Sequence, residues 1–233
     1  MFQSLVLIIL LVAFTGCELR INGAVNQAGR AELSVSGALG TKITALLRRV
    51  TAQSGAAATR PLLDAAELTT QLRAIAGIEH AEFKQKGSGG IEGQLVISKI
   101  SSFIPQYIPY TLVWEEAAHS GKMMLRIDRT NGPAILALFS PDLGDYLSAL
   151  MAPIATGEEL TKNSYLELLN SVYNAEIAAE IAAARLKLTL TVPGEISTIR
   201  GGAYTGRQAV FDTALLDFFV LEKPLLYEIQ WRQ

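Results

Sequence analysis

Apolar and polar residues alternate early in the chain, and the period of the pattern then changes. Residues 19–37 carry apolar side chains at every second position on both sides of the polar segment NQAG, which predicts a β-hairpin. Residues 41–53 repeat apolar side chains at steps of three and four instead, which predicts a helix with Thr41 as its cap. A second helix is expected next, because Asp64 and Glu67 are spaced as in a capping box.

Two more hairpins are predicted in the middle of the chain. The segments IEHAEFKQK and IEGQLVISKI alternate around the turn sequence GSGG, and IPYTLVWEE and KMMLRIDR alternate around AAHSG. Each turn sequence is rich in the small residues that hairpin loops require. The middle of the chain is therefore expected to return to antiparallel sheet.

The section 133–184 is expected to be a helical insertion. Its first part, PAILALF, fits a short apolar helix or a buried strand. The following segment, NSYLELLNSVYNAEIAAEIAAARL, has apolar side chains at steps of three and four. These form one continuous stripe made of Leu166, Leu169, Tyr173, Ile177 and Ile181. Such a stripe packs into a core more often than it binds a ligand. It nevertheless supplies the candidate contacts for an apolar ligand, if the helices leave a cavity against the sheet.

The end of the chain shows strand patterns again. RLKLTLTVPGEI has leucines on one face before a Pro-Gly turn, and RQAVFDTAL and PLLYEIQW are the last strand candidates. Runs of hairpins interrupted by helices predict an α+β fold, with a mostly antiparallel sheet covered by helices. We expect one such domain over residues 17–233.

An uncharged apolar segment opens the sequence. Residues 1–16 contain no charged side chain, and residues 5–13 are an unbroken apolar block. This block is about as long as the apolar region of a signal peptide and is too short to cross a bilayer comfortably. Thr15 and Gly16 then precede Cys17, the only cysteine of the chain. We therefore expect residues 1–16 to be a signal peptide.

The segment Phe14-Thr15-Gly16-Cys17 resembles the lipobox of bacterial lipoproteins, in which two small residues precede the cysteine that is lipidated. Spirochaete-type lipoproteins accept residues other than leucine at the position of Phe14. The resemblance implies palmitate-type acylation at Cys17, with the protein held on the extracytoplasmic side of the cell envelope. Two other interpretations stay open, an uncleaved N-terminal anchor helix and a buried first helix of a cytosolic protein.

The first 40 and last 50 residues together resemble LppM-type bacterial lipoproteins. The matching features are a hairpin directly after the cysteine, the step VPGEI, the glycine-rich turn RGGAYTGR and the closing strand PLLYEIQW. The resemblance implies an envelope-anchored domain that binds a lipid or another envelope component. It brings no catalytic residues and no cofactor.

Composition excludes several classes of function. The 20 basic and 22 acidic residues are mixed along the chain, so no basic surface for nucleic acid is indicated. One cysteine excludes an internal disulfide and a cysteine-based metal site. Neither glycine-rich segment has the pattern of a P-loop or a dinucleotide fingerprint, and SPDLGD lacks the ligands of a calcium loop.

The two histidines are the remaining candidates for chemistry. His80 lies near Glu79 and Glu82, and strand alternation places only Glu82 on its face. His119 lies in a predicted turn. Solvated residues are the better interpretation, so no catalytic residue and no metal ligand are assigned. The leading hypothesis is a non-enzymatic envelope lipoprotein that binds an apolar ligand or an envelope protein. The alternative is a structural or assembly subunit of an envelope complex without a ligand.

Overall fold

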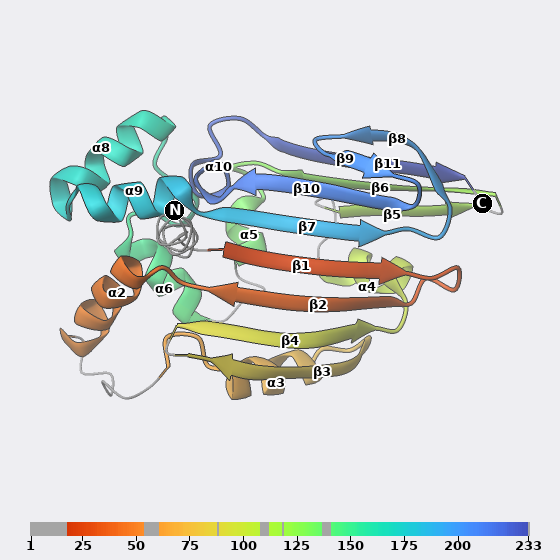
Figure 1. Cartoon of the computed structure of the whole chain (residues 1–233), viewed down its shortest axis with the longest axis horizontal. Helices are drawn as coiled ribbons and strands as arrows, with labels where there is room; N and C mark the ends of the chain where they lie inside the picture. Colours follow the sequence, from red (N-terminus) through yellow and green to blue (C-terminus); the bar gives the residue numbers. More distant parts are fainter. Residues whose placement is uncertain are drawn as a thin grey trace, which may run out of the picture.

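The computed structural model describes residues 18–53, 61–87, 89–107, 112–117, 119–136 and 141–232 (Figure 1). These residues form two mostly antiparallel sheets with helices at one end and on one side, so the predicted α+β class is confirmed. The larger sheet has seven strands in the order β3-β4-β2-β1-β7-β10-β9. Its strands are β1 (Glu18–Val25), β2 (Ala31–Ala38), β3 (Ile78–Lys86), β4 (Gly90–Ile97), β7 (Arg185–Thr191), β9 (Ala203–Thr205) and β10 (Gln208–Ala214).

The smaller sheet has four strands in the order β5-β6-β11-β8. Its strands are β5 (Leu112–Ala117), β6 (Ser120–Ile127), β8 (Glu195–Arg200) and β11 (Leu225–Arg232). The three predicted hairpins are all present, as β1–β2, β3–β4 and β5–β6. The Pro-Gly turn after β7 is not a hairpin, because β7 and β8 belong to different sheets.

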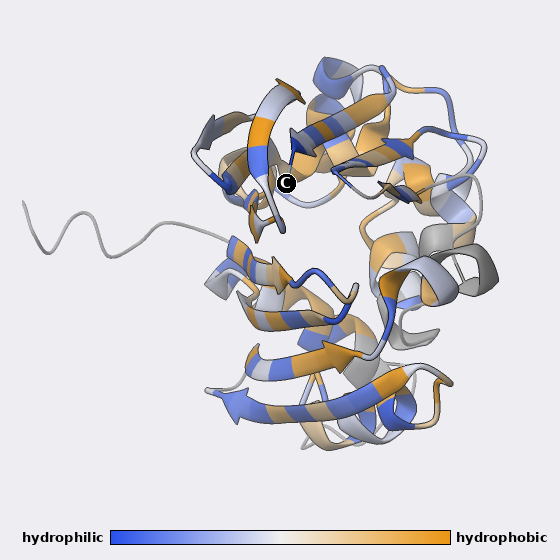
Figure 2. Ribbon diagram, turned by 90° about the vertical axis from the view of Figure 1, so that its right-hand side faces the viewer, coloured by the Kyte–Doolittle hydropathy of each residue, from blue (hydrophilic) through white to orange (hydrophobic). Residues whose placement is uncertain are grey.

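Strand register gives the seven-stranded sheet one polar and one apolar face. Ile21 pairs with Val35 on β2 and with Leu188 on β7, whereas the next residue, Asn22, pairs with Ser34 and Thr189. The same alternation continues into β4 and β10. Figure 2 shows it as alternating bands of hydrophobic and hydrophilic colour along the strands. The apolar face points into the molecule.

The two sheets meet in a shared hydrophobic cluster, here called the sheet–sheet cluster. It includes Phe211 of the larger sheet and Trp114, Met123 and Trp231 of the smaller one. The chain passes from one sheet to the other between β8 and β9, where Gly201 has a φ of 82°. Positive φ favours glycine, which explains the Gly-Gly step at this corner.

Helices form two further groups. Helix α3 (Ala65–Arg73) packs Ala65 against Phe83 on the apolar face of β3. The other group builds a larger hydrophobic cluster, here called the helical cluster, at the end of the sheets where β1 begins (Figure 1). These helices are α2 (Thr41–Gln53), α6 (Pro141–Ala149), α7 (Pro153–Thr156), α8 (Lys162–Val172), α9 (Ala175–Ala183) and α10 (Leu215–Val220). Short helices α4 (Ile100–Tyr107) and α5 (Gly132–Leu136) flank the β5–β6 hairpin.

The predicted continuous stripe is split between two helices. Helix α8 ends at Val172 and α9 begins at Ala175, so the stripe is carried by two helices and is interrupted between them. Asn174 causes the break, because its side-chain oxygen accepts a hydrogen bond from the backbone N–H of Ile177 at 2.9 Å and caps α9. Asparagine favours such caps over helix interiors, since its side chain competes with the backbone for hydrogen bonds.

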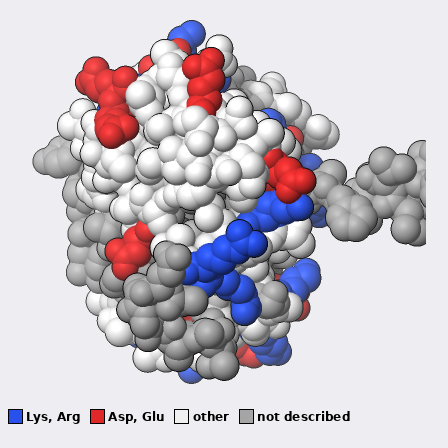
Figure 3. Space-filling view, turned by 90° about the vertical axis from the view of Figure 1, so that its left-hand side faces the viewer, with Lys and Arg blue, Asp and Glu red and all other residues white. Residues whose placement is uncertain are grey.

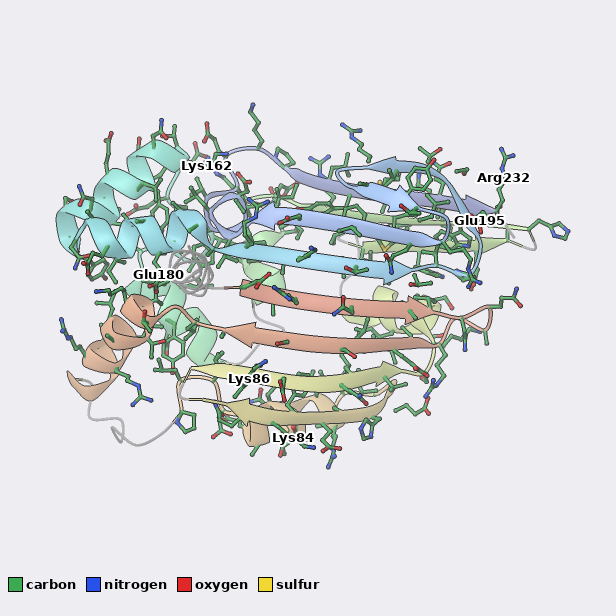
Figure 4. The ribbon with its side chains drawn as sticks, in the orientation of Figure 1. Lys84, Lys86, Lys162, Glu180, Glu195 and Arg232 are labelled. Carbon is green, nitrogen blue, oxygen red and sulfur yellow. The ribbon has the colours of Figure 1, made fainter. Side chains whose placement is uncertain are left out.

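The sequence predicts the N-terminal cap of α3 correctly but not the cap of α2. Asp64 caps α3 by accepting hydrogen bonds from the N–H groups of Ala66 and Glu67, both at 3.0 Å, as predicted. Thr41 was expected to cap α2, but Thr41 is the first residue of that helix. The carboxylate of Glu180, on α9, accepts the hydrogen bonds of the Lys42 and Ile43 N–H groups at 3.1 and 2.9 Å. A distant carboxylate therefore fixes α2 to α9 (Figure 4).

Gly40→Ala should break this connection, with a loss of about 1–2 kcal/mol in the free energy of unfolding. A Cβ at residue 40 would stand 2.0 Å from the Glu180 carboxylate, which would have to move away from the α2 N-terminus. Urea unfolding measures the loss. Gly144→Ala is the matched control: it lies within α6 with nothing within 4 Å, so it should stabilise the protein by about 0.5–1 kcal/mol. Equal effects of the two substitutions would contradict the role of Glu180.

Candidate functional site

The histidines lie in polar and exposed surroundings. Nε2 of His80 is 4.0 Å from a carboxylate oxygen of Glu82, which shares its face as strand alternation predicts. Glu79 instead contacts Arg30 at 2.9 Å, and the hydrogen bond from Arg30 lowers the pKa of that carboxyl. His119 is exposed in the β5–β6 turn. Within the described ranges, no three His, Cys, Asp or Glu side chains gather as metal ligands.

Each sheet has a shallow polar hollow on its outer face. The hollow on the larger sheet has a volume of about 420 Å³ and crosses β1, β2, β4 and β3, with Ser34, Glu82 and Gln94 among its lining residues. The hollow on the smaller sheet measures about 430 Å³ and includes Glu115, Lys122 and Arg232. Hydroxyl, amide and charged groups dominate both, so they are suited to solvent rather than to an apolar molecule.

The five residues of the apolar stripe are brought together by the fold, in the helical cluster. Leu169 and Ile181 are fully buried there and Ile177 nearly so, while Leu166 and Tyr173 pack against the cluster with part of their surface exposed. The helices that carry them, α8 and α9, pack against each other and against α10. Their role as ligand contacts stays a prediction.

A different apolar surface lies on the inner face of the larger sheet, near the start of β1. Leu19 pairs with Leu186 and Ile21 pairs with Leu188 across the parallel β1–β7 pair. All four side chains are half-buried. We call these four residues the inner strip. Within the described part of the chain, Leu19, Ile21 and Leu186 belong to none of the three hydrophobic clusters.

Burial of the inner face decreases along the strands toward the inner strip. At the far ends of the strands Val25, Ala31 and Leu190 are buried beneath the four-stranded sheet, with exposed fractions of 6% or less. Gly23 and Gly37 on the same face have no side chain, so leucines from neighbouring strands lie over them. The inner strip therefore lies between the sheet–sheet cluster and the helical cluster and offers apolar surface to a further group.

The strand pattern correctly placed Leu19 and Ile21 on one face, but it gave no reason to join them to β7. The pairing joins residues more than 160 positions apart, and a local sequence pattern cannot show which distant strand will be the partner. A signal was nevertheless present, because β1 and β7 both carry leucine or isoleucine at alternate positions. The partial exposure of these side chains becomes visible only after the helices are placed.

Comparisons with known proteins give one structural neighbour. No family model matches the chain, and no curated protein matches it by sequence. The folded domain of the Mycobacterium tuberculosis protein LppM, solved by NMR, aligns over 93% of this chain and 89% of that one. The TM-score is 0.40 and the sequence identity is 10%. Among the described residues, no helix is long and apolar enough to cross a membrane.

Proposed function

We propose that this protein is a non-enzymatic lipoprotein of the bacterial cell envelope, anchored through Cys17 on the extracytoplasmic side, and that its folded domain binds an apolar ligand. The half-buried inner strip is the observation that carries the binding role. The leader sequence carries the anchoring role, and Cys17 itself lies outside the described residues. No cofactor takes part.

The anchor follows from the order of residues at the start of the chain. An uncharged apolar block and two small residues precede Cys17, and β1 begins at the very next residue. Thioether lipidation needs a cysteine, and two or more acyl chains hold a protein stably at a membrane. Cleavage before Cys17 would remove the apolar block and leave the folded domain intact.

The ligand role follows from the inner strip. Leucine and isoleucine side chains contribute about 1.5–3 kcal/mol each when they are removed from water completely, so partial exposure of four neighbours forgoes part of that free energy. An acyl chain or a similar apolar molecule laid along β1 and β7 would recover it. The stripe residues Leu166 and Tyr173, which are partly exposed, are the proposed additional contacts on the helical side.

Mass spectrometry of the protein extracted from membranes tests the anchor. We expect a chain that begins at Cys17, with a mass increased by acyl groups, and we expect Cys17→Ser to remain unprocessed. A membrane-derived chain that begins at Met1 and carries an unmodified thiol would contradict the anchor and leave the ligand role to be judged by the next experiment.

Binding of a fluorescent fatty-acid analogue tests the ligand role. Leu19→Ser with Leu186→Ser should raise the dissociation constant about tenfold or more, because two apolar contacts of the ligand are lost. Val172→Ser, an exposed position on α8 outside the inner strip, is the control and should leave binding unchanged. Leu166→Ser shows whether the helical stripe also contributes. Wild-type protein that neither binds the analogue nor retains lipid on extraction would refute the binding role.

A structural or assembly subunit without a ligand is the second candidate. The polar outer face of the larger sheet supports it, since Asn22, Ser34 and Gln94 are exposed there and line the shallow hollow that crosses four strands. Crosslinking in cells separates the candidates. A stable protein partner recovered through the outer face, together with absent lipid, would favour the assembly role.

A further inference from the structure

The start of β1 defines which end of the domain lies next to the anchor. Glu18 pairs with Ala38 on β2, three residues before α2 begins, and with Arg185 on β7, two residues after α9 ends. Cys17 is joined to Glu18 by a single peptide bond, so no spacer separates the anchor from the sheet. We call the end of the molecule that carries α2, α6, α8 and α9 the anchor end (Figure 1).

The anchor end carries a basic helix. Helix α2 contains Lys42, Arg48 and Arg49 and no acidic residue, and all three basic residues are exposed. Figure 3 looks onto this end and shows a band of Lys and Arg side chains, with one acidic group directly beside the band and other Asp and Glu side chains in patches away from it. The acidic groups of α9 nearest to α2 are already engaged: Glu176 contacts Lys42 at 2.7 Å, and Glu180 caps α2.

We propose that the anchor end faces an anionic membrane surface and is tilted so that Arg48 and Arg49 of α2 contact lipid headgroups, while α6 and α8 lie farther from the bilayer. The inference rests on the proposed anchor at Cys17 and adds an orientation to it. Charge complementarity selects α2 as the contact, because exposed Glu167 on α8 and Asp145 on α6 would be repelled by the same lipids. The contact leaves the β1–β2 turn and the end of β11 pointing away from the bilayer (Figure 1).

The test is hydrogen exchange of α2 in the full lipid-bearing chain. The protein is reconstituted in vesicles of phosphatidylcholine alone or of phosphatidylcholine mixed with phosphatidylglycerol. We expect slower exchange over residues 41–50 on the anionic vesicles only. Replacing both arginines by glutamine should lower the ratio of membrane-contacting to non-contacting molecules by about fivefold per arginine, and so remove most of the added protection.

Lys99→Gln with Arg232→Gln is the matched control. It removes the same charge from the opposite end of the molecule, where Figure 4 labels Arg232, and should leave the protection of α2 unchanged. Lys99 lies beside the β1–β2 turn, where its side chain approaches Gly29.

Two results would overturn the proposal, and they differ in what they say about the anchor. Equal exchange of α2 on neutral and anionic vesicles, with the protein floating on both, contradicts the orientation alone. A chain that fails to float with neutral vesicles contradicts the anchor and the orientation together.

Discussion

Gly201→Ala is expected to lower the melting temperature by about 6–12 °C, a loss of about 3 kcal/mol in a domain of this size. Gly201 has a φ of 82°, which costs an alanine about 1–2 kcal/mol. The new Cβ would also stand 2.5 Å from the backbone oxygen of Leu226. Because that oxygen belongs to the neighbouring strand β11, it can move only if the four-stranded sheet shifts.

Gly206→Ala separates the two causes. Gly206 also has a positive φ, of 55°, but its nearest neighbour is the carboxylate of Glu195 at 3.5 Å. Only the backbone strain should appear there, about 1–2 kcal/mol. Calorimetry of both variants measures the difference. Equal destabilisation would show that the close approach of Gly201 to β11 contributes nothing, and that the corner between the two sheets tolerates a side chain.

Local features of the fold were the ones that the sequence predicted. The three hairpins depend on the alternation of apolar and polar residues and on turn residues within about 20 positions, and both features can be recognised in the amino-acid sequence. The cap at Asp64 is equally local, since the carboxyl and the N–H groups that it accepts lie within three residues. These elements form because neighbouring residues already favour them.

Long-range features were not predictable in the same way. One of the crossings between the two sheets lies at Gly201 and Gly202, a step that looks like an ordinary hairpin turn in the sequence. The cap of α2 comes from Glu180, whose carboxylate is 137 positions away from Ile43. The sequence does not predict helix α10, because LLDFFV is a short apolar run and periodicity cannot distinguish a strand from a helix over such a length.

The candidate site shows the same limit. The helical stripe was the most regular apolar pattern, and Leu169 and Ile181 are fully buried in the helical cluster. The inner strip has no distinguishing pattern in the sequence, because Leu19 and Leu186 have the spacing of ordinary strand residues. Its exposure depends on where two clusters end, a property of packing that no single segment encodes.

Trp231→Ala is expected to be the most destabilising side-chain truncation, at about 3–5 kcal/mol. Only 1% of Trp231 is exposed, and its ring lies over Gly121, where an added Cβ would stand 2.1 Å away. The ring centroids of Trp231 and Trp114 are 4.8 Å apart at an angle of 44°. Truncation would leave a cavity where the two sheets meet, and it would deprive Trp114 of its aromatic neighbour.

Trp231→Phe should cost less than half as much as the alanine substitution. Among the described residues, the indole N–H groups of Trp231 and Trp114 find no acceptor, and a buried unpaired donor costs about 1–3 kcal/mol. Phenylalanine keeps much of the ring and removes one such donor, so the two effects offset each other. Urea unfolding of both variants measures the pair, with Val172→Ala as a control expected to change stability by about 0.5 kcal/mol or less, because Val172 is 51% exposed. If the phenylalanine variant loses as much stability as the alanine variant, the indole nitrogen has an acceptor in the folded protein and the interface between the sheets is polar at that point.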